Sequence, residues 1–151
     1  MIQLVDEFFQ MKNDPEQLSI TPEIMDRLKR MHPSTMSERA NDDGPVAWVL
    51  IFPTTHDLMK KFLEEQISEG ILFEKTEPGI TYDSIYLCSA IVLPEFRRTG
   101  LAENMTVEAV DNIRKDHPIR TLFYWAFSPE GDLLANAVGR KTSLPVYKRS
   151  E

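Results

Sequence analysis

The stretch AIVLPEFRRTGLAENM, residues 90–105, joins an apolar run to two arginines, a glycine and a segment with helical spacing. The apolar run predicts a strand over residues 84–93, which Pro94 ends. From Gly100 to about Lys115, apolar residues recur on one helical face and polar residues on the other. A helix N-terminus presents unpaired N–H groups and the positive end of the helix dipole, so it favours anions. The stretch therefore predicts a strand, a turn suited to an anion, and a helix.

Similar patterns predict the other secondary structure elements. The expected helices span residues 2–12, 22–32, 56–69 and 129–138, and the further expected strands span 46–52, 120–127 and 144–149, the last at a sheet edge. Residues 34–45 are polar and rich in turn formers, which predicts a connection, and Pro53 is expected to end the strand before it. The expected fold class is α/β, or α+β if the strands pair mostly antiparallel, in a single domain of residues 1–151.

Composition limits the functions that fit this chain. The net charge of −7 argues against general nucleic-acid binding, because phosphate contacts need a basic surface. No apolar run approaches the roughly 20 residues of a membrane helix, and residues 1–14 lack the basic and small-residue pattern of a secretory signal, so a cytoplasmic location is expected. One cysteine and three scattered histidines provide no metal-ligand spacing, so no metal is expected.

The segment VLPEFRRTGLA, Val92–Ala102, resembles the V-x-P-x-[YF]-R-x-x-G-x-[GA] motif of the GNAT superfamily of acyl-CoA-dependent N-acetyltransferases. Arg97, Gly100 and Ala102 fall on the core positions of that motif. The order of the expected elements around the motif is also similar to that family over about two-thirds of the chain.

This resemblance implies that the chain binds acetyl-CoA as a cosubstrate. The backbone from Arg98 to Ala102 would wrap the pyrophosphate, and the pantetheine arm would pair with the strand edge near Ala90. The strands 84–93 and 120–127 would splay into a wedge that admits the arm. The residues implied in acetyl-CoA binding are Ala90, Ile91, Val92, Arg97, Arg98, Thr99, Gly100, Leu101 and Ala102. Dimers are common in the resembling family, so a homodimer is a further expectation.

The catalytic residues of the family are not obvious in this sequence. Where many members have a tyrosine that protonates the leaving thiolate, the chain has Gly139, and where histone-type members have a glutamate base, it has Tyr86. Tyr86 and Cys88 share one face of their strand and are the catalytic candidates. Both residue types are also typical of an apolar core, which is the alternative interpretation.

Other conspicuous residues surround these candidates. The loop over 73–84 carries Glu74, Glu77 and Asp83, and it is a candidate cover for the acceptor site. Tyr124 is a candidate for lining the acceptor pocket. The aromatic side chains of Trp48, Phe123 and Trp125 are expected in the core.

These observations predict an enzyme that transfers acetyl from acetyl-CoA directly to a primary amine of a small molecule or peptide. The acidic composition favours a cationic acceptor. The absent tyrosine and glutamate leave two alternatives open. One is a catalytically degenerate module that binds CoA as a sensor or scaffold, and the other is an interaction protein that keeps only the fold.

Overall fold

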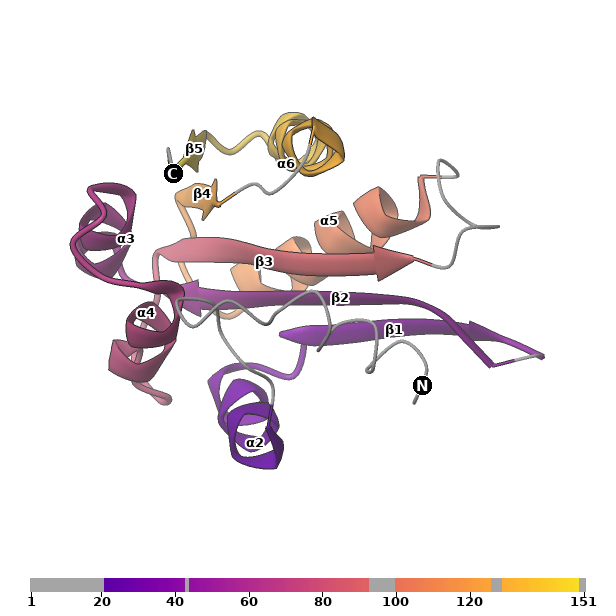
Figure 1. The fold of residues 1–151 in the computed structure, drawn as a ribbon, viewed down its shortest axis with the longest axis horizontal. Helices are drawn as coiled ribbons and strands as arrows, with labels where there is room; N and C mark the ends of the chain where they lie inside the picture. Colours follow the sequence, from indigo (N-terminus) through magenta and orange to yellow (C-terminus); the bar gives the residue numbers. More distant parts are fainter. Residues whose placement is uncertain (1–20, 43, 93–99, 126–128, 150–151) are drawn as a thin grey trace.

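A single mixed sheet forms the centre of the molecule, as a computed structural model shows for residues 21–42, 44–92, 100–125 and 129–149 (Figure 1). The strands are β1 (Met36–Asn41), β2 (Gly44–Thr54), β3 (Ser84–Val92), β4 (Thr121–Tyr124) and β5 (Val146–Lys148), in that spatial order. The helices are α2 (Pro22–Met31), α3 (His56–Leu63), α4 (Glu69–Lys75), α5 (Leu101–Arg114) and α6 (Pro129–Thr142). The chain therefore has the predicted α/β fold class.

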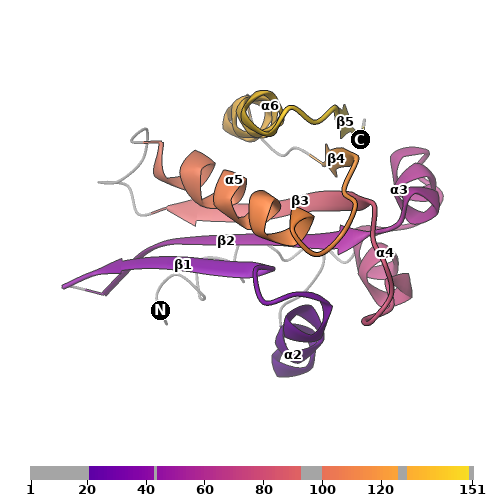
Figure 2. The same cartoon turned by 180° about the vertical axis from the view of Figure 1, so that it is seen from behind.

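The sheet changes from antiparallel to parallel pairing at β3. β1, β2 and β3 pair antiparallel, whereas β3 with β4 and β4 with β5 pair parallel. A parallel pair needs a crossover connection, and α5 and α6 provide the two crossovers. In Figure 2, α5 lies across the sheet as one of these crossovers. As a result β3, β4 and β5 all end on the same side of the molecule.

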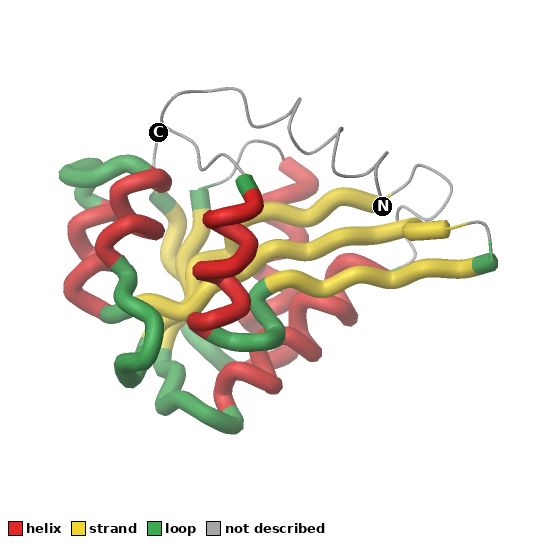
Figure 3. Tube along the Cα trace, turned by 90° about the horizontal axis from the view of Figure 1, so that it is seen from below, coloured by secondary structure: helices red, strands yellow, loops and turns green. Residues whose placement is uncertain are grey.

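Helices cover both faces of the sheet, as the view in Figure 3 shows. On one face, α2, α3 and α4 pack on a core that includes Trp48, Phe52, Tyr86 and Phe123. On the other face, α5 and α6 pack on a second core of aliphatic side chains from β2, β3 and β4. The middle of β2 is buried on both sides, as its continuous apolar run predicts.

Several sequence predictions are confirmed. α2 begins behind Thr21, whose Oγ1 accepts a hydrogen bond from the Ile24 amide, and α5 begins directly after Gly100. The strands predicted over 84–93, 120–127 and 144–149 correspond to β3, β4 and β5, with β4 inside the sheet and β5 at its edge. The predicted helix over residues 2–12 lies outside the described residues. α6 continues to Thr142, beyond the predicted end at residue 138.

The prediction of a connection over 34–45 is wrong, because Met36–Asn41 forms the edge strand β1. Pro53 also does not end β2, which continues to Thr54. The last residue pair of β1 with β2 is Met36 with Leu50, and beyond it β3 is the only strand of the described residues that pairs with this part of β2. The Ile51 amide donates toward β1, to the carbonyl of Thr35. The nitrogen of Pro53 therefore points to the same side, past the end of the β1 ladder, where a proline costs no ladder hydrogen bond.

The single helix predicted over 56–69 is wrong as well, because the chain forms α3 and α4 in its place. α3 ends at Leu63, and Glu65 has a positive φ of 62° that no helix continues through. Ser68 then caps α4 by accepting a hydrogen bond from the Ile71 amide. Gly70 thus lies inside α4 and does not terminate a helix. This break turns α4 so that its first residue, Glu69, faces the sheet.

Candidate active site

The ladder between the parallel strands β3 and β4 is short. They pair over four residue pairs, from Ser84 with Thr121 to Leu87 with Tyr124. β4 ends at Tyr124, while the ladder of β3 with β2 runs on to Val92. In that ladder Leu50 pairs with Ser89 and Ile51 with Leu87, so Cys88 is the extra residue of a β-bulge. We call this region, where β4 ends and β3 bulges, the fork.

A buried polar cluster of Glu69, Tyr86 and Cys88 lies beside the fork. We include Arg149 in this cluster, because it stacks on the Phe62 ring that packs against Tyr86. The hydroxyl of Tyr86 donates a hydrogen bond of 2.5 Å to Oε2 of Glu69, and Sγ of Cys88 lies 3.8 Å from the same oxygen. Tyr86 and Glu69 are both 0% exposed. Tyr86 and Cys88 do share one face of β3, and the structure adds a carboxylate that reaches both.

The local sequence explains why Glu69 is buried. Glu69, Leu72, Phe73 and Thr76 follow helical spacing and are all buried. This face of α4 therefore carries a carboxylate where a core helix would have an apolar side chain. Glu69 also lies in the first turn of α4, where the helix dipole favours a negative charge. The helical spacing of Glu69 with Leu72 and Phe73 indicates that Glu69 lies on the buried face of a helix. The prediction of one helix over 56–69 placed Glu69 at a helix end and obscured this spacing.

The environment of Tyr86 keeps its hydroxyl protonated. Burial is the largest cause that raises the pKa of Tyr86 well above 10, and the charge of Glu69 adds to it. Arg149 acts in the opposite direction and lowers the same pKa. A phenolate is therefore disfavoured. For Tyr86 to relay a proton, its oxygen must accept one proton at the same time as its hydroxyl proton moves to Glu69.

Aromatic rings enclose Tyr86. Its ring centroid lies 5.3 Å from that of Phe52 and 5.1 Å from those of Phe62 and Phe123. These are ordinary distances for aromatic pairs in a core. The aromatic residues expected in the core, Trp48, Phe123 and Trp125, all belong to or pack against this cluster.

Arg149 lies directly after β5, with its guanidinium against the rings of Phe62 and Trp125, which are nearly perpendicular to each other. Its Cζ is 4.5 Å from the centroid of Phe62 and 4.7 Å from that of Trp125. Its backbone amide donates to the carbonyl of Tyr124, which fixes the residue at the end of β4. The side chain is only 5% exposed, and within the described part of the chain neither Nε nor Nη1 has a hydrogen-bond partner.

The aromatic contacts of Arg149 do not offset the free-energy cost of burying its charge. A cation–π contact contributes about 0.5–2 kcal/mol, whereas removing an ion from water costs several kcal/mol even after the protein relaxes. Two such contacts leave the donors at Nε and Nη1 unsatisfied. An arginine in this state attracts an oxyanion that can accept from these donors.

The N-terminus of α5 lies at the end of the predicted phosphate-binding turn. Gly100 is the N-cap with a left-handed φ of +81°, and no described side chain caps the helix. A Cβ at this position would meet no described atom within 4 Å. Leu101 and Ala102 occupy the half-buried first turn of α5. The predicted site residues Arg97, Arg98 and Thr99 lie outside the described residues, while Ala90, Ile91 and Val92 end β3.

Tyr124 lies on the opposite face of the sheet from Tyr86 and does not contribute to the polar cluster. Its hydroxyl donates a 2.8 Å hydrogen bond to Asp132 on α6. Burial and this hydrogen bond raise the pKa of Tyr124 to about 12. Asp132 also contacts Lys148 of β5, so this contact ties α6 to two strands.

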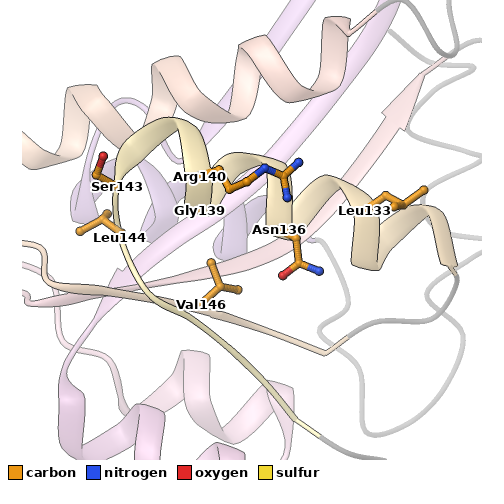
Figure 4. Close-up of a pocket in the computed structure, with 7 residues that line it drawn as sticks. All are labelled: Leu133, Asn136, Gly139, Arg140, Ser143, Leu144 and Val146. Carbon is orange, nitrogen blue, oxygen red and sulfur yellow. The ribbon is translucent and has the colours of Figure 1, made fainter.

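The position of the family's tyrosine cannot hold a side chain here. A Cβ on Gly139 would lie 2.3 Å from Cγ2 of Val146 and 3.2 Å from the carbonyl oxygen of Leu144. α6 therefore packs closely against the segment leading into β5, and glycine is required. The surface next to this contact is hollowed, but the residues that line the hollow include none of the polar cluster (Figure 4).

Of the acidic residues expected near the acceptor site in a loop over 73–84, Glu74 lies in the last turn of α4, Glu77 follows that helix, and Asp83 directly precedes β3. Glu74 and Glu77 are exposed, and their backbone carbonyls accept hydrogen bonds from Arg27 and Tyr82. Asp83 accepts from the hydroxyl of Ser84. The carboxylate at the polar cluster is instead that of Glu69.

Two further features are absent from the described part of the chain. Among the described residues, no group of three or more histidine, cysteine, aspartate or glutamate side chains is arranged to hold a metal ion. None of the described helices has the length and apolar character needed to cross a bilayer. In comparisons of the chain with protein families, curated proteins and solved structures, no family model, protein or structure matches it.

Proposed function

We propose that the chain is a GNAT-type acetyltransferase that transfers acetyl from acetyl-CoA to a primary amine. The observation that carries the proposal is the fork followed by α5, a 14-residue helix whose N-cap is a left-handed glycine. The V-x-P-x-F-R-x-x-G-x-A pattern of Val92–Ala102 ends at this glycine and the first turn of the helix. We also propose, from the sequence, a cytoplasmic location and a homodimer.

The first turn of α5 would bind the pyrophosphate of the cosubstrate. Its N–H groups have no acceptor within the helix, and the helix dipole favours the negative charge. The conformation of Gly100 turns the chain directly into this helix, and the absence of a Cβ leaves room for phosphate oxygens. Arg97 and Arg98 would add charge next to the same turn. The pantetheine arm would lie along β3 from Ala90 to Val92.

The polar cluster would assist the chemical step. The amine nitrogen attacks the thioester carbonyl, so that a C–N bond forms and the C–S bond breaks. The nitrogen loses a proton to the oxygen of Tyr86 while Tyr86 gives its own proton to Glu69. The 2.5 Å contact between these two residues fits such a relay. Tyr86 ends neutral, which agrees with its raised pKa.

The leaving thiolate would depart without a tyrosine from α6. Gly139 occupies the corresponding position and has no room for a side chain. A thiol has an ordinary pKa of about 8.5, so a thiolate is a tolerable leaving group near neutral pH. The missing acid therefore limits the rate without preventing transfer.

A CoA-binding module without turnover is the second candidate function. The complete burial of Tyr86 and Glu69 favours it, because a relay must be reached by the amine. The absent tyrosine at position 139 favours it as well.

Calorimetry and a turnover assay test these functions together. Acetyl-CoA is titrated into the protein, and release of the CoA thiol is then followed with a panel of amines. Binding with turnover supports the acetyltransferase, and binding without turnover across the panel supports the module. If acetyl-CoA does not bind, both proposals are wrong, and the remaining hypothesis is an interaction protein with this fold.

A further inference from the structure

We propose that Arg149 binds a carboxylate of the acceptor, so that the acceptor class is a molecule carrying both an amine and a carboxylate, as a free amino acid does. This inference rests on the proposed acetyl transfer for the role of the amine. The anion site itself depends only on the surroundings of Arg149. The two parts can therefore be tested separately.

The first step is the unsatisfied state of Arg149. Its guanidinium is almost completely buried, and within the described residues Nε and Nη1 lack hydrogen-bond partners. Buried polar groups in proteins are nearly always paired, so these two donors are suited to an oxyanion that can accept from both. The rings of Phe62 and Trp125 hold the guanidinium, so it is fixed for a ligand in advance.

The second step is the position of Arg149 in the sheet. It follows β5, and Trp125 follows β4, so both lie at the carboxyl ends of parallel strands. Ligands of α/β sheets bind at this end, where strands diverge. The fork between β3 and β4 lies at the same end, next to Arg149.

The third step is the charge of the polar cluster. The hydroxyl of Tyr86 contacts the carboxylate of Glu69, and the guanidinium of Arg149 stacks on the Phe62 ring that packs against the ring of Tyr86. A negative and a positive group therefore lie next to the same tyrosine. An amino acid matches this arrangement, with its carboxylate toward Arg149 and its amine toward the Tyr86–Glu69 pair, where it attacks as the neutral amine after losing its first proton to solvent. An amine that carries no carboxylate would leave the guanidinium of Arg149 without an anion.

A carboxylate fits better than a phosphate. The site provides one cation within aromatic walls, and one positive charge balances one carboxylate. A dianionic phosphate usually needs several backbone N–H groups or further cations.

The anion site can be tested without acetyl-CoA, through tryptophan fluorescence. Benzoate and sulfate are titrated into the full-length protein, and the emission of Trp125 is expected to change with benzoate at lower concentrations than with sulfate. The variant W125F retains Trp48 alone and assigns the signal. In R149M the benzoate response is expected to disappear, while the melting temperature stays equal or rises, because an unpaired buried charge has been replaced by an apolar side chain.

Turnover then tests the acceptor class. Each common L-amino acid is compared with its carboxamide, which has the amine but no carboxylate. We expect kcat/KM to be about 30-fold or more higher for the acids than for the amides, and we expect R149K to bring the acid-to-amide ratio of kcat/KM close to one. R149K keeps the charge but loses the forked donors. It can therefore replace R149M in the benzoate titration if R149M does not fold.

The possible results have distinct meanings. A benzoate response that depends on Arg149, with no acetyl transfer to any amine, keeps the carboxylate site and overturns the acetyltransferase. Equal kcat/KM for acids and amides overturns the acceptor class. A wild type that shows no benzoate response, or that prefers sulfate, overturns the carboxylate site itself.

Discussion

The hydroxyl of Tyr86 and the carboxylate of Glu69 are joined by a 2.5 Å hydrogen bond between residues 17 positions apart. The contact links the central strand β3 to α4, and both side chains are completely buried. A carboxylate in such surroundings is stabilised by its hydrogen bonds, and each one that is lost is costly. The pair is therefore a structural contact as well as the proposed proton relay, and variants must separate the two roles.

Y86F is expected to lower kcat by about 10- to 1000-fold with little change in acetyl-CoA affinity, because one positioned group is lost. It is also expected to destabilise the fold by about 1–3 kcal/mol, since Glu69 loses a donor. Steady-state kinetics, calorimetry and urea unfolding measure the three quantities.

The matched control for Y86F is Y82F. Tyr82 is equally buried and donates a 2.5 Å hydrogen bond to the carbonyl of Glu77, outside the polar cluster. Y82F is expected to lose about 1 kcal/mol of stability with an unchanged kcat. Near-wild-type turnover of Y86F would remove Tyr86 from the mechanism.

C88A is expected to change stability by about 1 kcal/mol and to leave kcat nearly unchanged. Cys88 is the buried bulge residue of β3, and its Sγ lies 3.8 Å from Glu69, beyond a strong hydrogen bond. C88S, which retains a donor, is the comparison. A folded but inactive C88A would contradict this prediction and indicate that Cys88 accepts the acetyl group covalently.

The sequence predicts the elements with a strong apolar pattern and misses those without one. α5 and β3 follow from their apolar spacing. β1 was missed because most of its side chains are polar and exposed, as an edge strand permits. The break between α3 and α4 was missed because the apolar stripe that begins at Leu58 in α3 continues into the break as far as Ile67.

The candidate site is only partly visible in the sequence. Tyr86 and Cys88 share a strand face by simple alternation, which the sequence predicts. Glu69 and Arg149 reach them from α4 and from the end of β5, and no local pattern reports such long-range packing. Arg149 in particular looks like an ordinary charged residue near the end of the chain.

Tyr124 predicts a pH dependence of stability. Its pKa is about 12 in the folded protein and about 10 when unfolded, so the folded state keeps a proton that the unfolded chain loses. Its contribution is fully present below about pH 10 and is lost as the pH rises toward 12. Unfolding in urea at several pH values from 9 upward is expected to give a smaller pH dependence for Y124F than for wild type. Identical slopes for the two proteins would contradict the assignment to Tyr124.

G139A is expected to destabilise the protein by about 1–3 kcal/mol. The new methyl group would lie 2.3 Å from Cγ2 of Val146, too close for α6 to keep its position. G70A is the control, because its Cβ would meet only the Ser68 hydroxyl, at 3.9 Å, within helix α4. That variant is expected to gain about 0.4–1 kcal/mol. Equal melting temperatures for the two variants would refute the close packing of α6 on β5.

The most direct test of the proposed cosubstrate site is a side chain at Gly100. Valine is a poor choice, because φ is +81° and a β-branched residue is strongly strained in that region. Asparagine tolerates a positive φ, and its Cβ would meet no described atom within 4 Å. G100N is therefore expected to fold, and its side chain would lie where the proposal puts a phosphate group.

We expect G100N to weaken acetyl-CoA binding by about 10- to 100-fold in calorimetry, because at least one hydrogen bond to a charged oxygen is lost. G79N is the matched control: Gly79 has φ +85°, an equally open Cβ position, and a place in the turn before β3, away from α5. It is expected to bind acetyl-CoA as wild type does. Both variants carry the same backbone strain. A difference between their affinities for acetyl-CoA therefore arises from contacts with the ligand and not from a change in the fold. If G100N is folded, by circular dichroism, and binds acetyl-CoA as tightly as G79N, the N-terminus of α5 does not hold the pyrophosphate and the acetyltransferase proposal loses the observation that carries it.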